Sequence, residues 1–428
     1  MCRPMSRSRV RRLGVEEEFH LVDAASRGLV GCAPELLARL PGEVYVEELQ
    51  RCAVEVNSGV FASLRELRAD LVHHRQVLVD AAGSLGAAVV ASGSVPLCPA
   101  VEPGVTENPR FRRMLADYRL LVREQLICSS QVHVDVTDRD EAVRVAARVG
   151  PYVPMLLALS ASSPFRADGT DTGYASMRTL VWSRWPTAGP TPPVTSAAEY
   201  DRLVADLIAS GVISDPGMIY FDLRPSDRYS TLELRVCDSC PSVDTIVLVA
   251  ALFRALVERE SARLASGAPA PRTSPTLVRA AMWRAARSGL EEELVDVDTL
   301  RPRPAPRVVE DLVRSLRPEL EAAGDWATVT ALTTEVLRAG SWATRQRRAL
   351  RRRGLLTDVV DLLIDATAGR CAPVTAPHSP DRSWTTPVPG RHTGEFALVN
   401  TADETTGPAG GTTAGPGKDG GEHVRNLR

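Results

Sequence analysis

The sequence predicts an α+β protein in which about six strands, mainly antiparallel, are backed by long helices. Short segments with alternating apolar and polar residues occur in the first 240 residues and are typical of half-buried strands. Long amphipathic segments separate them, and from residue 275 to 368 the pattern is mostly helical. Strands and helices do not alternate regularly, and no glycine-rich dinucleotide turn is present. A doubly wound parallel sheet is therefore disfavoured.

The elements follow from these patterns in chain order. The strand pattern occurs at 13–19, 44–48, 53–58, 87–93, 127–136, 218–223 and 231–236. Helices are expected at 34–40, 61–86, 108–125, 138–160, 197–210 and 242–266, and over most of 275–368 apart from a proline-rich break at 302–306. A long irregular loop is expected at 163–193, and structureless loops of that length are usually functional.

The chain of 428 residues is expected to form one large domain over 13–369. A basic segment, 1–12, precedes it and lacks the apolar stretch of a signal peptide. The segment 370–428 is rich in Pro, Gly and Thr and is expected to be a disordered tail. Apolar residues make up 44% and charged residues 24% of the chain, which is ordinary for a globular protein.

Charge and cysteine usage exclude several classes of function. The net charge of −2 offers no field that would attract nucleic acid or an anionic membrane. Lys418 is the only lysine, which excludes a phosphate-loop lysine and Schiff-base chemistry in the domain. Eight scattered cysteines fit a reducing cytoplasm, and Cys237 and Cys240 are expected to be plain buried thiols. No run approaches the roughly 20 apolar residues of a membrane span.

Three consecutive carboxylates in the first strand suggest a cation site. On an extended strand Glu16 and Glu18 share one face, and Glu17 points to the other. Two carboxylates about 6.6 Å apart on one face repel each other unless a cation lies beside them. The alternative is a solvated edge strand whose charges discourage aggregation.

Later strands supply matching polar residues on one face. They are Glu48, Glu55, His133 with Asp135, Glu233 with Arg235, and Arg224. Oxygen-rich ligand sets with one imidazole suit Mg²⁺ or Mn²⁺. Five carboxylates exceed the needs of one ion, so we expect two or more ions clamping a polyphosphate, with arginines neutralising the remaining charge. A metal-dependent hydrolase could use the same residues.

Six motifs in order resemble the glutamate–cysteine ligase type 2 family, the bacterial carboxylate–amine ligases related to glutamine synthetase. The similarity runs from about residue 12 to 368. The motifs are Gly14-x-Glu16-x-Glu18-Phe19, Glu55-Val56-Asn57-Ser58-Gly59, Val132-His133-Val134, Asp171-Thr172-Gly173-Tyr174-Ala175-Ser176-x-Arg178, Trp185-Pro186-x-x-Gly189-Pro190 and Thr231-Leu232-Glu233-Leu234-Arg235-Val236.

The resemblance implies a glutamine synthetase-like fold and ATP-dependent amide formation through an acyl phosphate, with glutamate and cysteine as substrates. ATP and Mg²⁺, or Mn²⁺, are the implied cofactors, and a homodimer is common in the family. The implied metal ligands are Glu16, Glu18, Glu55, His133 and Glu233, with Glu48 as a further candidate. The implied catalytic residues are Arg235, Arg178 and Arg224, and the nucleotide contacts are Glu16, Glu18, Arg178, Arg235 and Tyr174.

Two residues depart from the family pattern. Relatives usually have histidine where this chain has Gln131, and glycine where it has Asp135. If Gln131 faces the site, an imidazole is lost, and Asp135 adds bulk and negative charge. Two alternatives therefore stay open: a ligase that joins a different acid and amine, and a non-catalytic descendant that binds a nucleotide or metabolite. His20 is a further neighbour of Glu18 on the first strand, either beside the site or packed within the sheet.

Overall fold

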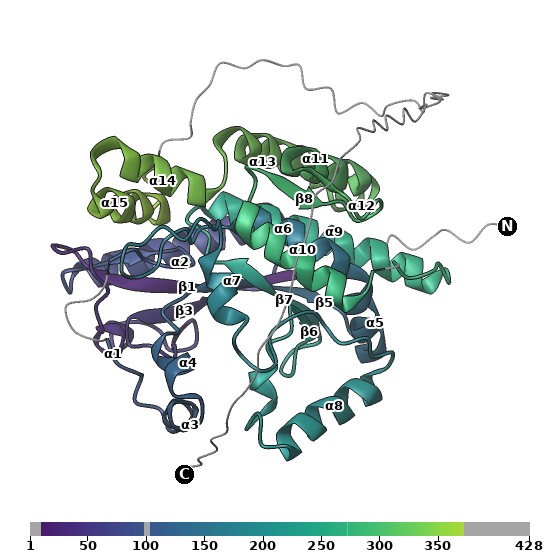
Figure 1. Cartoon of the computed structure of the whole chain (residues 1–428), viewed down its shortest axis with the longest axis horizontal. Coiled ribbons are helices and arrows are strands. Elements are labelled where there is room, and N and C mark those ends of the chain that lie inside the picture. Colours follow the sequence, from purple (N-terminus) through teal and green to yellow (C-terminus); the bar gives the residue numbers. More distant parts are fainter. Residues whose placement is uncertain (1–9, 98–102, 272, 372–428) are drawn as a thin grey trace, which may run out of the picture. The chain divides into compact units, whose positions relative to one another are not determined.

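The computed structural model describes residues 10–97, 103–271 and 273–371. Most of the predicted N-terminal segment and of the predicted tail, residues 1–9 and 372–428, lies outside the described residues. The six cysteines within them are all free, and Cys237 and Cys240 are buried as expected. Figure 1 shows a sheet with helices on both sides.

The sheet is seven-stranded, and all its described strand pairs are antiparallel. Its order is β2-β3-β1-β5-β7-β6, with β4 also paired to β1. The strands are β1 Leu13–Asp23, β2 Tyr45–Glu47, β3 Ala53–Asn57, β4 Ala87–Val90, β5 Ser129–Asp135, β6 Leu223–Pro225 and β7 Thr231–Asp238. The predicted α+β class and mainly antiparallel sheet are therefore confirmed.

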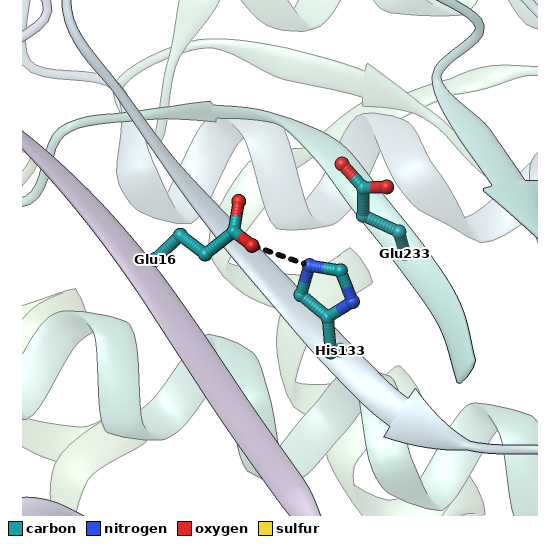
Figure 2. A group of neighbouring side chains, drawn as sticks. All are labelled: Glu16, His133 and Glu233. Carbon is teal, nitrogen blue, oxygen red and sulfur yellow. Dashed lines mark ion pairs between the residues drawn. The ribbon is translucent and has the colours of Figure 1, made fainter. Parts of the chain in front are cut away.

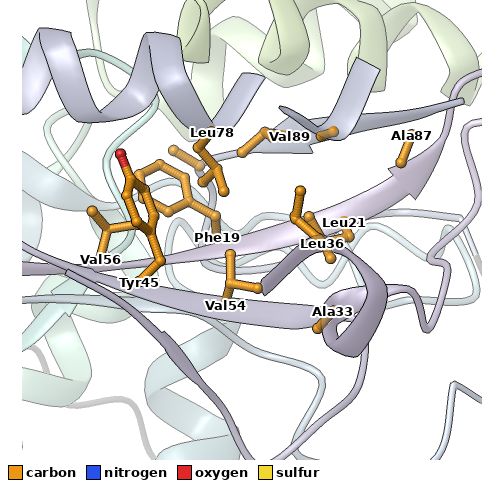
Figure 3. Packing of buried hydrophobic residues seen from close by; sticks show 12 residues of the cluster. Phe19, Leu21, Ala33, Leu36, Tyr45, Val54, Val56, Leu78, Ala87 and Val89 are labelled. Atoms are coloured by element: carbon orange, nitrogen blue, oxygen red, sulfur yellow. The ribbon is translucent and has the colours of Figure 1, made fainter. Parts of the chain in front are cut away.

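One face of the sheet is apolar and is covered by helices. Phe19 of β1 packs with Val54 and Val56 of β3 beneath Leu78 of helix α2, as Figure 3 shows. The helices α2 Leu64–Gly83, α6 Val153–Ser160 and α9 Val243–Ala265 contact this face. Because side chains alternate along β1, burying this face directs Glu16 and Glu18 to the other one.

Further helices flank the sheet on both sides (Figure 1). The segment between 275 and 368 forms an additional helical layer with a small β8–β9 hairpin, Glu293–Val295 and Pro302–Pro304, at the proline-rich break. The helices not yet named are α1 Ala33–Leu37, α3 Pro109–Tyr118, α4 Leu120–Arg123, α5 Arg139–Val149, α7 Met177–Trp182, α8 Ala197–Ala209, α10 Pro275–Ser288, α11 Ala305–Ser315, α12 Arg317–Ala323, α13 Trp326–Ala339, α14 Trp342–Arg353 and α15 Leu356–Thr367. Short 3-10 helices lie at Gly150–Tyr152 and Pro216–Met218.

Several predicted boundaries were wrong. The strand predicted at 218–223 begins only at Leu223, because Ile219 and Phe221 are buried in a core cluster instead of alternating on a sheet. The helix predicted over 108–125 breaks at Arg119, whose φ of 49° is outside the helical range. The predicted loop 163–193 contains helix α7.

The stretch Arg139–Ser160 is long and apolar enough, by length and composition, to cross a membrane. Within the fold, 78% of its most apolar window is buried, as in the core helix of a soluble protein. It is also not one continuous helix, because Gly150–Tyr152 separates α5 from α6.

Glu17 points to the apolar face, as predicted, and is paired with Arg75 of α2. Glu17 is 1% and Arg75 3% exposed. We expect Arg75→Met to lower the free energy of unfolding by about 3 kcal/mol, because Glu17 would stay buried without its counter-charge. Urea unfolding measures this difference. Arg68→Met, in the same helix but in an exposed pair with Asp244, should cost less than about 1 kcal/mol; equal costs would contradict the expectation.

Candidate active site

The structure brings the six predicted metal ligands into two groups on the polar face of the sheet. One group is Glu16, His133 and Glu233, and the other is Glu18, Glu48 and Glu55. Within each group, one ligand atom from every residue lies within 4.8 Å of the others. Glu16 and Glu18 are two apart on β1, so the central strand contributes to both groups.

The first group spans three adjacent strands, β1, β5 and β7 (Figure 2). His133 Nε2 lies 3.2 Å from Glu16 Oε1, but the two atoms are not oriented to form a hydrogen bond. The other ring nitrogen, Nδ1, lies 2.9 Å from Thr231 Oγ1. Burial would lower the pKa of His133, but Glu16 and Glu233 raise it overall. A hydroxyl at Nδ1 orients the ring and leaves Nε2 directed at the carboxylates, as in metal-binding histidines.

The second group consists of crowded carboxylates with few cationic neighbours. Ser129 holds Glu18 through its backbone N–H at 2.6 Å and its hydroxyl at 2.7 Å. Burial, with the negative charge of Glu18, raises the pKa of Glu48 to about 8. Burial and the neighbouring carboxylates also raise the pKa of Glu55 well above its usual value. A divalent cation would relieve this repulsion, and an all-oxygen donor set suits Mg²⁺ or Mn²⁺.

Two arginines neutralise the first group. Arg224 Nε lies 2.8 Å from Glu233 Oε2, and Arg235 also pairs with this carboxylate. Burial alone would raise the pKa of Glu233, but Arg235 and Arg224 together hold it far below its usual value. Planar guanidinium groups beside acidic ligands are suited to contacting phosphate oxygens. The predicted phosphate-contacting residue Arg235 therefore lies next to the predicted metal ligands.

Two other predicted site residues have different surroundings. Tyr174 receives a hydrogen bond of 3.1 Å from Trp283 of α10, and its carbonyl accepts one from Arg347 of α14. These contacts place Tyr174 beside the helical layer, and none of its described contacts involves the carboxylates. Its expected contact with the nucleotide stays a prediction. Arg178 is 2% exposed, and its terminal nitrogens donate to the carbonyls of Val236 and Arg235.

The structure also shows the surroundings of Gln131, Asp135 and His20. Gln131 faces the site, where its amide contacts both Arg235 and Glu18. Asp135 accepts a hydrogen bond of 2.7 Å from Arg12, so its charge is compensated at the edge of the site. His20 is 1% exposed, two residues after Glu18 on β1, and burial lowers its pKa to about 4.

The sequence prediction missed several residues that support the site. Ser129 and Thr231 orient Glu18 and His133, and each lies two positions from a residue already singled out. The alternation along β5 and β7 could have identified both. Trp182 packs against a core cluster, and its ring centre lies 5.5 and 5.8 Å from the guanidinium carbons of Arg178 and Arg235.

The buried Asp222, whose carbonyl accepts a hydrogen bond from Arg235 N, gives a prediction for pH dependence. Burial raises its pKa from 3.8 to about 7, although Arg178 and Arg279 oppose this rise. The Asp222 carboxyl therefore contributes to the free energy of unfolding. This contribution is fully present below about pH 4 and is lost as pH rises through about 7. We expect Asp222→Asn to remove this part of the pH dependence, measured by urea unfolding between about pH 5 and about pH 8. The same slope in the variant as in the wild type would contradict the assignment.

Comparison with known sequences places this chain in a family. The profile of glutamate–cysteine ligase family 2 matches residues 12–362. A Rhodococcus jostii protein named "Putative glutamate--cysteine ligase 2-3" is 65% identical over 360 residues, which are 84% of this chain and 45% of that protein. A Mycolicibacterium smegmatis protein named "Putative glutamate--cysteine ligase 2-2" is 62% identical over 84% of this chain and 90% of that protein. The chain thus spans less than half of the first relative's length.

Solved structures share the fold at low sequence identity. A glutamate–cysteine ligase from Francisella tularensis, in complex with AMP, has a TM-score of 0.62 and 12% identity, over 85% of this chain and 90% of that one. A bifunctional glutathione synthetase from Pasteurella multocida has a TM-score of 0.59 and 15% identity, over 85% of this chain and 52% of that one. At these identities, the likeness is one of fold.

Proposed function

Because the chain belongs to glutamate–cysteine ligase family 2, we propose that it is an ATP-dependent carboxylate–amine ligase of the cytoplasm. Its expected substrates are L-glutamate and L-cysteine, joined as γ-glutamylcysteine with release of ADP and phosphate. The single observation that carries the proposal is the juxtaposition of two acidic groups, Glu16–His133–Glu233 and Glu18–Glu48–Glu55, with two arginines.

The donor atoms of the six ligands would hold divalent cations, Mg²⁺ or Mn²⁺. The raised pKa values of Glu48 and Glu55 and the unbonded Nε2 of His133 fit this role. When bound, such cations supply charge neutralisation and orientation for a polyphosphate. Most of the work in phosphoryl transfer is positioning and charge screening, which these residues can provide.

Arg235 and Arg224 have the second role in this proposal. Both guanidinium groups now contact Glu233. A cation held by these ligands would share the charge of Glu233, and Arg235, kept in place by its other contacts, would then have N–H groups to donate to a phosphate oxygen while the substrate carboxylate attacks the γ-phosphate of ATP. An acyl phosphate results, and ADP leaves. The amine then attacks the acyl carbon and releases phosphate.

A phosphate-release screen tests the function directly. Purified protein with ATP and Mg²⁺ is assayed against a matrix of acidic amino acids and amines, and omission of each component is the control. We expect release that requires an acid and an amine together, with glutamate plus cysteine among the active pairs. ATP binding by calorimetry without turnover for any pair would contradict the ligase and favour a non-catalytic nucleotide-binding protein.

Metal removal gives a second expected result. Chelation with EDTA should abolish phosphate release, and either Mg²⁺ or Mn²⁺ should restore it, because the donor set is dominated by carboxylate oxygens. The measurement is ADP release before and after each addition. Full activity in the chelated, metal-free protein would contradict the proposed role of the two acidic groups.

A further inference from the structure

We propose that a β-bulge in β7, fixed by Gln131 and Arg178, aims Arg235 at the acidic groups. Gln131 acts on the Arg235 side chain, and Arg178 acts on the main chain of the bulge. Both would be positioning residues that act through Arg235. The placement of Arg235 is inferred from the fold alone, and the expected effect on turnover rests on the proposed function.

The bulge is visible in the pairing of β5 with β7. Ser130 pairs with Cys237, but Val132 pairs with Leu234. One residue of β5, Gln131, therefore faces two residues of β7, Arg235 and Val236. A bulge of this kind disrupts the ladder locally and redirects a side chain, and bulges are over-represented next to active sites.

Gln131 fixes the guanidinium end of Arg235. Its Oε1 accepts a hydrogen bond of 2.5 Å from Arg235 Nη1, which also contacts Glu233. Its Nε2 lies 3.3 Å from Glu18 Oε1. The side chain is 4% exposed. An uncharged amide can accept from the arginine and donate to the carboxylate at once, so Gln131 links Arg235 to both acidic groups.

Arg178 fixes the main chain of the bulge. It lies on α7, which packs against β7 (Figure 1). Its Nη1 donates to Val236 O at 3.0 Å and its Nη2 to Arg235 O at 3.2 Å. The fork of one guanidinium thus satisfies the two carbonyls of the two bulged residues. A lysine could not reproduce this geometry, because its N–H groups share one nitrogen and lack the planar, fixed spacing of the arginine fork.

Trp182 completes the arrangement by supporting both arginines. The guanidinium carbon atoms of Arg178 and Arg235 lie 5.5 and 5.8 Å from the centre of its ring. Arg235 also lies 6.0 Å from the ring of Tyr220. The guanidinium of Arg235 is therefore constrained by an amide, a carboxylate and two aromatic rings. Without the contacts of Gln131, or without the hydrogen bonds from Arg178 to the bulge, we expect the Arg235 guanidinium to adopt other orientations.

Crystal structures of variants test the geometry independently of activity. Gln131→Met conserves volume and removes both polar contacts, and Arg178→Lys keeps the charge but loses the fork. We expect each to displace the Arg235 guanidinium by about 1 Å or more with the strands in place. Ser130→Ala is the matched control, because this neighbour on β5 has a buried hydroxyl with no hydrogen-bond partner among the described residues. An unmoved Arg235 in Gln131→Met would overturn the inference, whether or not the wild type is a ligase.

A double-mutant cycle tests the route through Arg235. A misplacement of about 1 Å can cost up to about a hundredfold in rate, so we expect Gln131→Met to lower kcat for phosphate release at least tenfold, with the KM for the amino acids within about twofold. In an Arg235→Ala background, the same change should have no further effect. An equal loss in both backgrounds would show that Gln131 acts independently and would overturn the proposed route.

Discussion

Arg235→Ala is expected to lower kcat for phosphate release by about a hundredfold to a thousandfold, or about 3 to 4 kcal/mol. The guanidinium is buried beside Glu233, so its charge acts in a region from which water is largely excluded. A fixed positive charge there stabilises the negative charge of the transition state more strongly than it would in water. Steady-state ADP release at saturating substrates measures the change, and the KM for the amino acids should move less than kcat.

The matched control for this variant is Arg284→Ala, which removes an arginine from an exposed pair with Glu293 on the helical layer. It should leave kcat and KM unchanged. If Arg235→Ala raised KM but left kcat unchanged, a role for Arg235 in the transition state would be contradicted.

Glu55→Gln is expected to reduce turnover by about a thousandfold, which is the scale for removing one electrostatic group from an active site. The fold should not be weakened. Glu55 is surrounded by Glu16, Glu18 and Glu48, and burial with these charges raises its pKa. A neutral amide of equal size relieves the repulsion. We therefore expect the melting temperature in EDTA to stay equal or rise while phosphate release is lost.

Glu47→Gln is the matched control for Glu55→Gln, because Glu47 lies on β2 beside Glu48 but is exposed and paired with Asn108. It should keep full turnover. Unimpaired phosphate release by Glu55→Gln at limiting Mg²⁺ would contradict the assignment of Glu55 as a metal ligand.

The sequence was sufficient to predict the polar face of the sheet. Side chains alternate between the two faces along a strand, so Glu16 and Glu18 could be assigned to one face of their strand, and His133 to the same face of its strand as Gln131, without coordinates. The antiparallel neighbours β1, β5 and β7 then bring them together. The same alternation predicted that Glu17 would point away from the site.

Other features depend on contacts that local sequence patterns do not encode. The partner of Glu17, Arg75, lies 58 residues along the chain. Tyr174 is held by Trp283, 109 residues away, so its motif gave no indication that it belongs to the helical layer. The bulge at Arg235 changes neither composition nor alternation visibly, and hence the capping role of Arg178 could be found only in three dimensions.

The central claim is that the two acidic groups gather around divalent cations. Calorimetric titration of the metal-free protein with Mn²⁺ tests it most directly, with the wild type compared with a Glu16→Gln/Glu55→Gln double variant. The account predicts saturable binding of at least two Mn²⁺ ions per chain in the wild type and loss of that binding in the variant. Equal binding by both proteins, or none by the wild type, would contradict it.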